Sequence, residues 1–234
     1  MMKLLLFSNS TNAGEEYLTY PLPYIKDFLK SINGKNLVFI PYAAVTFSFD
    51  QYETNVNNRL KTIGYNVNSI HHYNHPEEQI QKADVIIVGG GNTFHLLTHL
   101  YKNNLLPDIR EKVLAGTPYI GWSAGSNVAC PTIGTTNDMP IVQPPSLEAL
   151  NLIPFQINPH YIDANPSGHA GETREQRIWE FLAANKNKTV LGLREGTLLH
   201  IEDKKIWLKG NKPARLFKYN ESPKEIEAGS EIQL

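Results

Sequence analysis

The sequence predicts an α/β fold in which a doubly wound, mostly parallel sheet is flanked by helices, with antiparallel strands near the C-terminus. Two observations predict it: short apolar runs that are continuous rather than alternating, and amphipathic segments between those runs. Continuous apolar runs are typical of strands that are covered on both faces, as in a parallel sheet. Strands that alternate with helices indicate a doubly wound architecture.

The predicted strands of the sheet are five apolar runs. They lie at residues 3–7, 36–40, 84–88, 118–122 and 189–193. Three segments between them are predicted helices, at residues 49–62, 93–101 and 172–184. The last of these carries Ile178, Phe181 and Leu182 at helical spacing.

The C-terminal part has a different character. Segments 197–203, 204–210 and 214–219 are short, with polar turns between them, and predict antiparallel strands at a mixed edge. The chain shows no internal repeat and no convincing linker. We therefore expect a single domain over residues 1–234.

Composition narrows the function classes. Of the 234 residues 41% are hydrophobic and 19% charged, and the net charge of −1 provides no electrostatic footprint for nucleic acid or an anionic membrane. The single cysteine, Cys130, excludes an intrachain disulfide and fits a reducing compartment. The apolar run at the N-terminus is too short for a signal peptide, and no run approaches the length of a membrane span. We expect a cytoplasmic protein, a monomer or homodimer, with no nucleic-acid or membrane partner.

The fourth apolar run ends in Gly121-Trp122-Ser123-Ala124-Gly125, followed by a plausible first helical turn. This is the Gly-x-Ser-x-Gly pattern in its strand–turn–helix context, where a serine nucleophile sits on a sharp turn between small residues. The helix that follows offers free N–H groups near an oxyanion. The alternative is that the small residues only let a helix pack tightly on the sheet.

A second glycine cluster, Gly89-Gly90-Gly91, ends another predicted strand. Its spacing matches neither common phosphate-binding motif. Its bare N–H groups suit an oxyanion hole made by Ala124 together with Gly90 or Gly91. A simple tight turn is the competing interpretation.

A serine nucleophile needs a base, and His160 is the favoured candidate among eight histidines. It follows an Asn-Pro dipeptide at the end of a short apolar segment. The others have different predicted places: His71, His72 and His75 at the surface, His95 and His99 on a polar helix face without a third metal ligand, His169 in a loop that could contact substrate, and His200 in a C-terminal strand. Either Asp138 or Glu195 could orient the base. The alternative for Asp138 is a turn before Pro140, and the alternative for Glu195 is a loop carboxylate paired with Arg194.

Longer motifs carry a family resemblance. The stretches G-W-S-A-G-S-N-V-A-C-P-T-I-G-T-T-N-D-M-P-I-V, L-N-L-I-P-F-Q-I-N-P-H and G-H-A-G-E-T-R-E-Q-R-I resemble the peptidase E family of α-aspartyl dipeptidases. The resemblance extends to three shorter stretches, N-S-T, V-F-I-P-Y-A-A-V-T and I-I-V-G-G-G-N-T-F. The likeness runs from about residue 4 to about residue 200.

The resemblance implies a fold like the class I glutamine amidotransferases, with serine in place of their nucleophilic cysteine. It implies cleavage of dipeptides with an N-terminal aspartate, without metal or other cofactor. By motif, Ser123 is the nucleophile and His160 the base, while Asp138 and Glu195 both occupy positions considered for the acid.

An aspartyl substrate needs a cation, because an unpaired buried carboxylate is costly and guanidinium matches it with two hydrogen bonds. Arg174 and Arg177 lie one turn apart on a predicted helix, where pairing with neighbouring glutamates is the alternative. The resemblance favours Arg174 as the anchor, with His169 as a second contact. Two other functions stay open: another serine hydrolase, such as a cyanophycinase-like enzyme or a deacylase, and a binder of a small acidic metabolite with a structural Ser123.

Overall fold

The computed structural model describes residues 1–32, 34, 36–163 and 170–233. The strands are β1 (Lys3–Phe7), β2 (Leu37–Ile40), β3 (Val67–Ser69), β4 (Val85–Val88), β5 (Tyr119–Trp122), β6 (Gln156–Tyr161), β7 (Thr189–Arg194), β8 (Thr197–Glu202), β9 (Lys205–Gly210), β10 (Ala214–Lys218) and β11 (Lys224–Ile226). The helices are α1 (Pro21–Lys30), α2 (Phe49–Leu60), α3 (Pro76–Lys82), α4 (Thr93–Lys102), α5 (Leu105–Leu114), α6 (Ala124–Asn127) and α7 (Arg174–Ala184), with 3₁₀ turns η1 (Lys61–Ile63) and η2 (Ile70–His72).

The larger of two sheets has seven strands in the order β3-β2-β4-β5-β1-β8-β9. The first five of these run parallel, and β8 and β9 are antiparallel at the edge. The predicted α/β class, with a mostly parallel sheet and antiparallel strands near the C-terminus, is therefore confirmed. Helices α2, α4 and α7 match the three predicted helices, whereas α1, α3 and α5 were not predicted.

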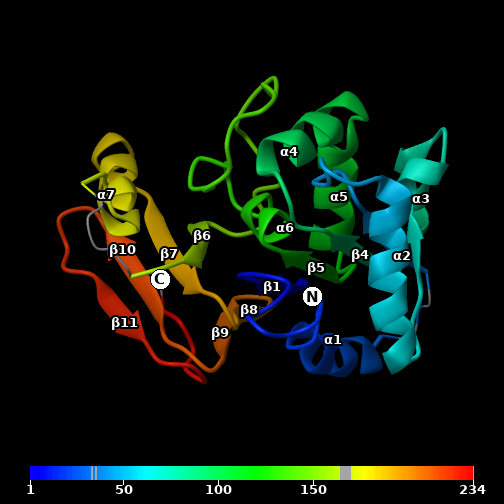
Figure 1. Ribbon diagram of the computed structural model, residues 1–234, viewed down its shortest axis with the longest axis horizontal. Coiled ribbons are helices and arrows are strands. Elements are labelled where there is room, and N and C mark those ends of the chain that lie inside the picture. The colour runs from blue at the N-terminus through cyan, green and yellow to red at the C-terminus, as the bar shows by residue number, and fades with distance from the viewer. Residues whose placement is uncertain (33, 35, 164–169, 234) are drawn as a thin grey trace.

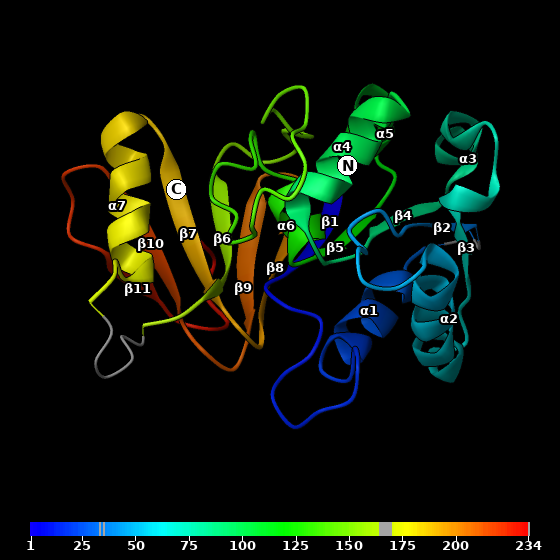
Figure 2. The ribbon, with the colours of Figure 1, turned by 45° about the horizontal axis from the view of Figure 1, so that its top comes forward.

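Two helical layers cover this sheet because successive side chains of a strand point to opposite faces. Along β1, Leu5 and Phe7 pack in one apolar cluster with α1 and α2, while Leu4 and Leu6 pack in another with α3, α4 and α5. Figure 2 shows α1 and α2 on one side of the sheet and the other three helices on the opposite side. The strands are thus buried on both faces, as their continuous apolar runs predicted.

The smaller sheet, in the order β11-β10-β7-β6, differs from the prediction for residues 189–193. This run was expected among the parallel strands of the main sheet, but as β7 it pairs in parallel only with β6 and antiparallel with β10. Figure 1 shows β6, β7, β10, β11 and α7 gathered at one end of the molecule. A continuous apolar run records burial on both faces and not the identity of the neighbouring strand, which explains the error.

Apolar packing continues from one sheet to the other. Leu6 of β1 belongs to the same buried cluster as Ile157 of β6 and Leu191 of β7. None of the helices in the described part of the chain combines the length and the apolar character needed to cross a membrane.

The turn after β5 is formed by close backbone contacts. A Cβ atom at Gly125 would lie 2.2 Å from the carbonyl oxygen of Val88, and one at Gly121 would lie 2.5 Å from that of Gly125. Only glycine allows α6 to approach β4 and β5 this closely. These two glycines thus fix where the chain turns at Ser123.

We predict that Gly125→Ala lowers the free energy of unfolding by about 3 kcal/mol, because the new methyl group meets backbone that cannot move aside. The measurement is urea unfolding. Gly64→Ala is the control, because Gly64 has a positive φ of 87° but open space around it. This substitution should lower the free energy of unfolding by about 1 kcal/mol. A smaller loss at Gly125 than at Gly64 would contradict the prediction.

Candidate active site

Ser123 occupies the turn between β5 and α6 with φ 52° and ψ −111°. A non-glycine residue with positive φ is strained, and such strain persists only where the surroundings enforce it. Here the N–H of Ser123 donates to the carbonyl oxygen of Phe7 at 3.0 Å, and its own carbonyl accepts from the N–H groups of Ser126 and Asn127, each at 2.9 Å. The backbone is thereby fixed while the side chain stays partly exposed.

His160 also has a positive φ, of 53°, and is the next-to-last residue of β6. The sequence predicted a position just past a strand end, but the strand includes His160, and its register against β7 is interrupted between Asn158 and Tyr161. An irregularity of this kind re-aims a side chain.

Three side chains meet at the C-terminal end of β5. Nε2 of His160 lies 2.9 Å from Oγ of Ser123, and its Nδ1 lies 2.7 Å from Oε1 of Glu195. Because a carboxylate only accepts hydrogen bonds, Nδ1 carries the proton and Nε2 is left as an acceptor for the serine hydroxyl. This arrangement can take a proton from Ser123, which is what activates a serine for attack on a carbonyl group.

The hydroxyl of Ser8, which directly follows β1, joins the two sheets at this point. It is fully buried, accepts a hydrogen bond from the N–H of His160 at 2.9 Å, and donates one to the carbonyl oxygen of Leu193 in β7 at 2.7 Å. The adjacent Asn9 accepts from the N–H of Gly196 at 2.9 Å, one residue after Glu195. Ser8 and Asn9 thus position the segments that carry His160 and Glu195.

The glycine cluster lies beside Ser123. A Cβ atom at Gly90 would lie 3.0 Å from the Cβ of Ser123, so this position has no room for a side chain. The carbonyl of Gly90 accepts a hydrogen bond of 2.8 Å from Tyr52, and Tyr52 accepts one of 3.0 Å from the indole of Trp122. Burial raises the pKa of Tyr52 to about 12, so its hydroxyl keeps the proton it donates.

Anchoring the Gly90 carbonyl determines where the next N–H points. Carbonyl and N–H of a trans peptide point in opposite directions, so the N–H of Gly91 is directed away from Tyr52. Within the described residues, neither this group nor the N–H of Ala124 donates a hydrogen bond. Both remain available to a bound oxygen atom.

Asp138, the other candidate acid, is bound elsewhere. Its Oδ2 accepts from the N–H and the hydroxyl of Thr93, at 2.7 and 2.5 Å, and from the hydroxyl of Thr136 at 3.0 Å. It therefore ties its own loop to the start of α4, just after the glycine cluster. Arg194, considered as an ion-pair partner of Glu195, instead binds Asp163 and Glu225.

A pocket of about 250 Å³ lies beside Asp138. It is lined by Gly134, Thr135, Thr136, Asn137, Asp138, Met139, Asn158, Arg174, Arg177, Ile178 and Phe181. Arg174 donates to the side-chain oxygen of Asn137, whose amide in turn donates to the carbonyl of Pro159, the residue before His160. Burial, and then the nearby charge of Arg177, lower the pKa of Arg174 from its ordinary value.

Neither guanidinium of this pocket has an acidic partner among the described residues. Glu175, a neighbouring glutamate that could have paired with these arginines, pairs with Arg215 at 3.2 Å instead. A partly buried cation without a counter-ion favours an anionic ligand. His169, the other candidate substrate contact, lies outside the described residues.

The sequence analysis missed three supporting residues: Ser8, Tyr52 and Asn137. Each acts through backbone groups far away in the sequence, so no local motif marks it; only the N-S-T stretch beside Ser8 gave a signal. Cys130 offers no alternative nucleophile, because it is fully buried and burial raises the pKa of its thiol to about 12.

A model of peptidase family S51 matches residues 4–209. The chain is 55% identical over 223 residues to peptidase E of Nostoc sp., with 95% of this chain and 92% of the relative covered. It is 49% identical over 220 residues to peptidase E of Pasteurella multocida, with 94% of each covered.

Solved structures show the same fold. A Listeria monocytogenes protein assigned provisionally to peptidase E superposes with a TM-score of 0.66 at 26% identity, over 90% of this chain and 98% of that one. A peptidase from an acI-B1 actinobacterium gives a TM-score of 0.72 at 18% identity, over 100% and 97% of the two chains. The latter likeness concerns the fold alone.

We predict that Ser8→Ala slows covalent labelling of Ser123 by a fluorophosphonate at least tenfold, because His160 loses the contact that holds its strained backbone. Leaving two buried backbone groups unpaired also costs about 1–3 kcal/mol of stability. Ser126→Ala is the matched control: its buried hydroxyl bonds to the carbonyls of Phe7 and Gly121 and does not touch His160. Equal labelling rates in the two variants would contradict the prediction.

Proposed function

The chain belongs to peptidase family S51, and from this premise we propose that it is a serine dipeptidase that hydrolyses dipeptides with an N-terminal aspartate. The observation that carries the proposal is the chain of contacts from Ser123 through His160 to Glu195. Two close relatives bear the name peptidase E, which supports the same substrate class.

The reaction begins with attack by Oγ of Ser123 on the carbonyl carbon of the aspartyl residue. Its proton passes to Nε2 of His160, and Glu195 stabilises the resulting imidazolium through Nδ1–H. The N–H groups of Ala124 and Gly91 bind the oxyanion, with Gly90 as the residue that makes room beside Ser123. His160 then protonates the leaving amino group, and water, deprotonated by His160, hydrolyses the aspartyl ester.

We assign the orienting role to Glu195 rather than Asp138. Glu195 is within 2.7 Å of the imidazole, whereas the Oδ2 of Asp138 is occupied by Thr93 and Thr136. Asp138 then serves by holding the loop that lines the substrate pocket. Arg174 binds the side-chain carboxylate of the substrate in that pocket, with His169 as a second contact.

The setting of this activity is also proposed. The lone buried thiol of Cys130 fits a reducing cytoplasm, and the substrate is a small acidic dipeptide. A monomer or homodimer is the assembly we expect.

The test of the function is hydrolysis of Asp-Leu in the presence of EDTA. We expect wild type to cleave it, and kcat/KM to fall by roughly 10⁴-fold or more in Ser123→Ala, because the nucleophile is removed. Equal cleavage by both proteins would mean that Ser123 is not the nucleophile and that its turn is only structural. Failure of wild type to cleave, with Glu-Leu and β-aspartyl dipeptides in the same panel, would overturn the substrate class.

The assignment of the acid is tested by fluorophosphonate labelling of two isosteric variants. Glu195→Gln should slow labelling of Ser123 roughly 10²-fold or more, since the imidazolium loses its negative partner. Asp138→Asn should act chiefly on KM and thermal stability. Its labelling rate should be at least tenfold higher than that of Glu195→Gln. The reverse order of the two rates would assign the acid to Asp138.

We predict that Arg174→Met lowers kcat/KM for Asp-Leu by roughly 10²- to 10³-fold, because the substrate carboxylate is left without a partner. The neutral isostere Asn-Leu should be affected much less, so the ratio of the two rates is the measurement. Arg177→Met is the control, because Arg177 lines the same pocket but is exposed. An unchanged ratio in Arg174→Met, or an equal change in both variants, would argue against Arg174 as the anchor.

A further inference from the structure

Four potential metal ligands converge at the edge of the main sheet, on residues for which the proposed reaction has no use. Asp50 lies in the first turn of α2 and Glu53 follows it three residues later, whereas His71 and His72 form the end of η2. One ligand atom of each lies within 4.8 Å of all the others. We propose that these residues form a structural Zn²⁺ site.

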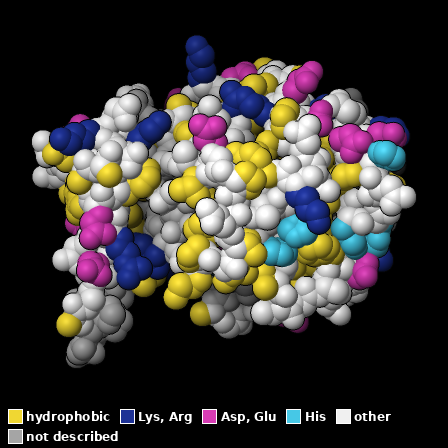
Figure 3. All heavy atoms as spheres, turned by 90° about the horizontal axis from the view of Figure 1, so that it is seen from above, with side chains coloured by type: hydrophobic (Ala, Val, Ile, Leu, Met, Phe, Trp, Pro, Cys, Tyr) yellow, Lys and Arg dark blue, Asp and Glu magenta, His cyan; other side chains and the backbone are white. Residues whose placement is uncertain are grey.

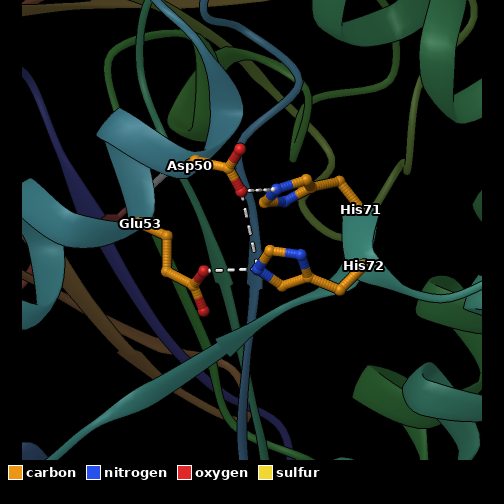
Figure 4. Close-up of side chains that lie close together, drawn as sticks. All are labelled: Asp50, Glu53, His71 and His72. Atoms are coloured by element: carbon orange, nitrogen blue, oxygen red, sulfur yellow. Dashed lines mark hydrogen bonds and ion pairs between the residues drawn. The ribbon is translucent and has the colours of Figure 1, made fainter.

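The side chains already face one another, as Figure 4 shows, with the two carboxylates on one side and the two imidazoles on the other. Oδ1 of Asp50 lies 3.0 Å from Nε2 of His71 and 3.8 Å from Nε2 of His72, and Oε2 of Glu53 lies 2.6 Å from Nε2 of His72. In a tetrahedral zinc site with bonds of about 2.0–2.1 Å, neighbouring ligand atoms are about 3.3 Å apart. The separations lie on both sides of that value, so small side-chain movements suffice.

Partners behind the ligands hold them in this orientation. Ser69, fully buried at the end of β3, places its hydroxyl 2.6 Å from Nδ1 of His71 and donates its N–H to Oε1 of Glu53 at 2.8 Å. Nε2 of His71 and Oε2 of Glu53 are thereby the atoms left for a metal. A hydroxyl can accept as well as donate, so it accommodates the Nδ1–H form of His71 that a metal on Nε2 requires.

Charge also favours a divalent cation here. The imidazole rings of His71 and His72 are only 3.9 Å apart, so both can face one ion. The two carboxylates beside them supply negative charge that a bound divalent cation would offset. Two imidazoles and two carboxylates suit Zn²⁺, whereas Mg²⁺ and Ca²⁺ prefer sets made of oxygen alone.

The place in the fold indicates a structural centre. Strand β3 is the edge of the sheet and is separated from β5, and so from Ser123, by β2 and β4. A metal bound by α2 and η2 would tie this edge strand to the helix that covers it. Figure 3 shows histidine side chains in the right half of the surface, with acidic side chains beside the outermost of them. Asp50 and His72 are exposed, so zinc in solvent can reach the site.

The test begins with untagged wild type that has been treated with a chelator and then titrated with Zn²⁺ by calorimetry. We expect one tight equivalent, no comparable binding of Mg²⁺ or Ca²⁺, and a Tm that rises by roughly 5–10 °C at a zinc concentration a hundredfold above Kd. Co²⁺ should give the intense visible bands of tetrahedral coordination. Absence of a saturable equivalent would overturn the proposal.

Two variants at exposed ligands locate the site without threatening the fold. His72→Gln and Asp50→Asn, whose side chains are 47% and 75% exposed, should each weaken zinc binding at least tenfold and remove the cobalt bands. The matched control is His75→Gln, which removes the next histidine along the chain, paired with Glu77 at 3.2 Å. Zinc affinity that survives in the ligand variants, or falls instead in His75→Gln, would place the metal elsewhere and overturn the proposal.

Discussion

The hydroxyl of Ser8 is the contact on which the site depends, because it joins the end of β1 to β6 and β7. Apolar packing between the two sheets is non-directional and would tolerate small sliding movements. The hydrogen bonds of Ser8 with the N–H of His160 and the carbonyl of Leu193 do not tolerate such movements, because a shift would leave these groups unpaired. The 2.9 Å separation between His160 and Ser123 is therefore set where the sheets meet.

The two residues that meet there both have positive φ, which costs of order 1–3 kcal/mol each. Close-packed glycines enforce the turn at Ser123, and the Ser8 contact and the interrupted strand register enforce that at His160. Each side chain is directed out of its own strand, so that groups from separate sheets come together. The strain is thus the means by which the fold presents the two side chains to each other.

Local patterns in the sequence were enough for several parts of this structure. Continuous apolar runs identified β1, β2, β4, β5 and β7, because burial on both faces leaves no polar alternation. The small residues around Ser123 identified the sharp turn, because crowding there depends on the residues of the turn itself. Tyr52 and Asn137 escaped notice, because each bonds to backbone groups contributed by a different part of the chain.

By itself, then, the sequence determined the strands formed by the apolar runs, helices α2, α4 and α7, the α/β class and the turn that carries Ser123, all of which follow from short-range periodicity and backbone sterics. Only the tertiary structure decided that residues 189–194 belong to a second sheet, and that Glu195 rather than Asp138 lies against His160. It also brought His71 and His72 to Asp50 and Glu53. These pairings depend on which strands become neighbours, and that is decided by packing between segments far apart in the chain.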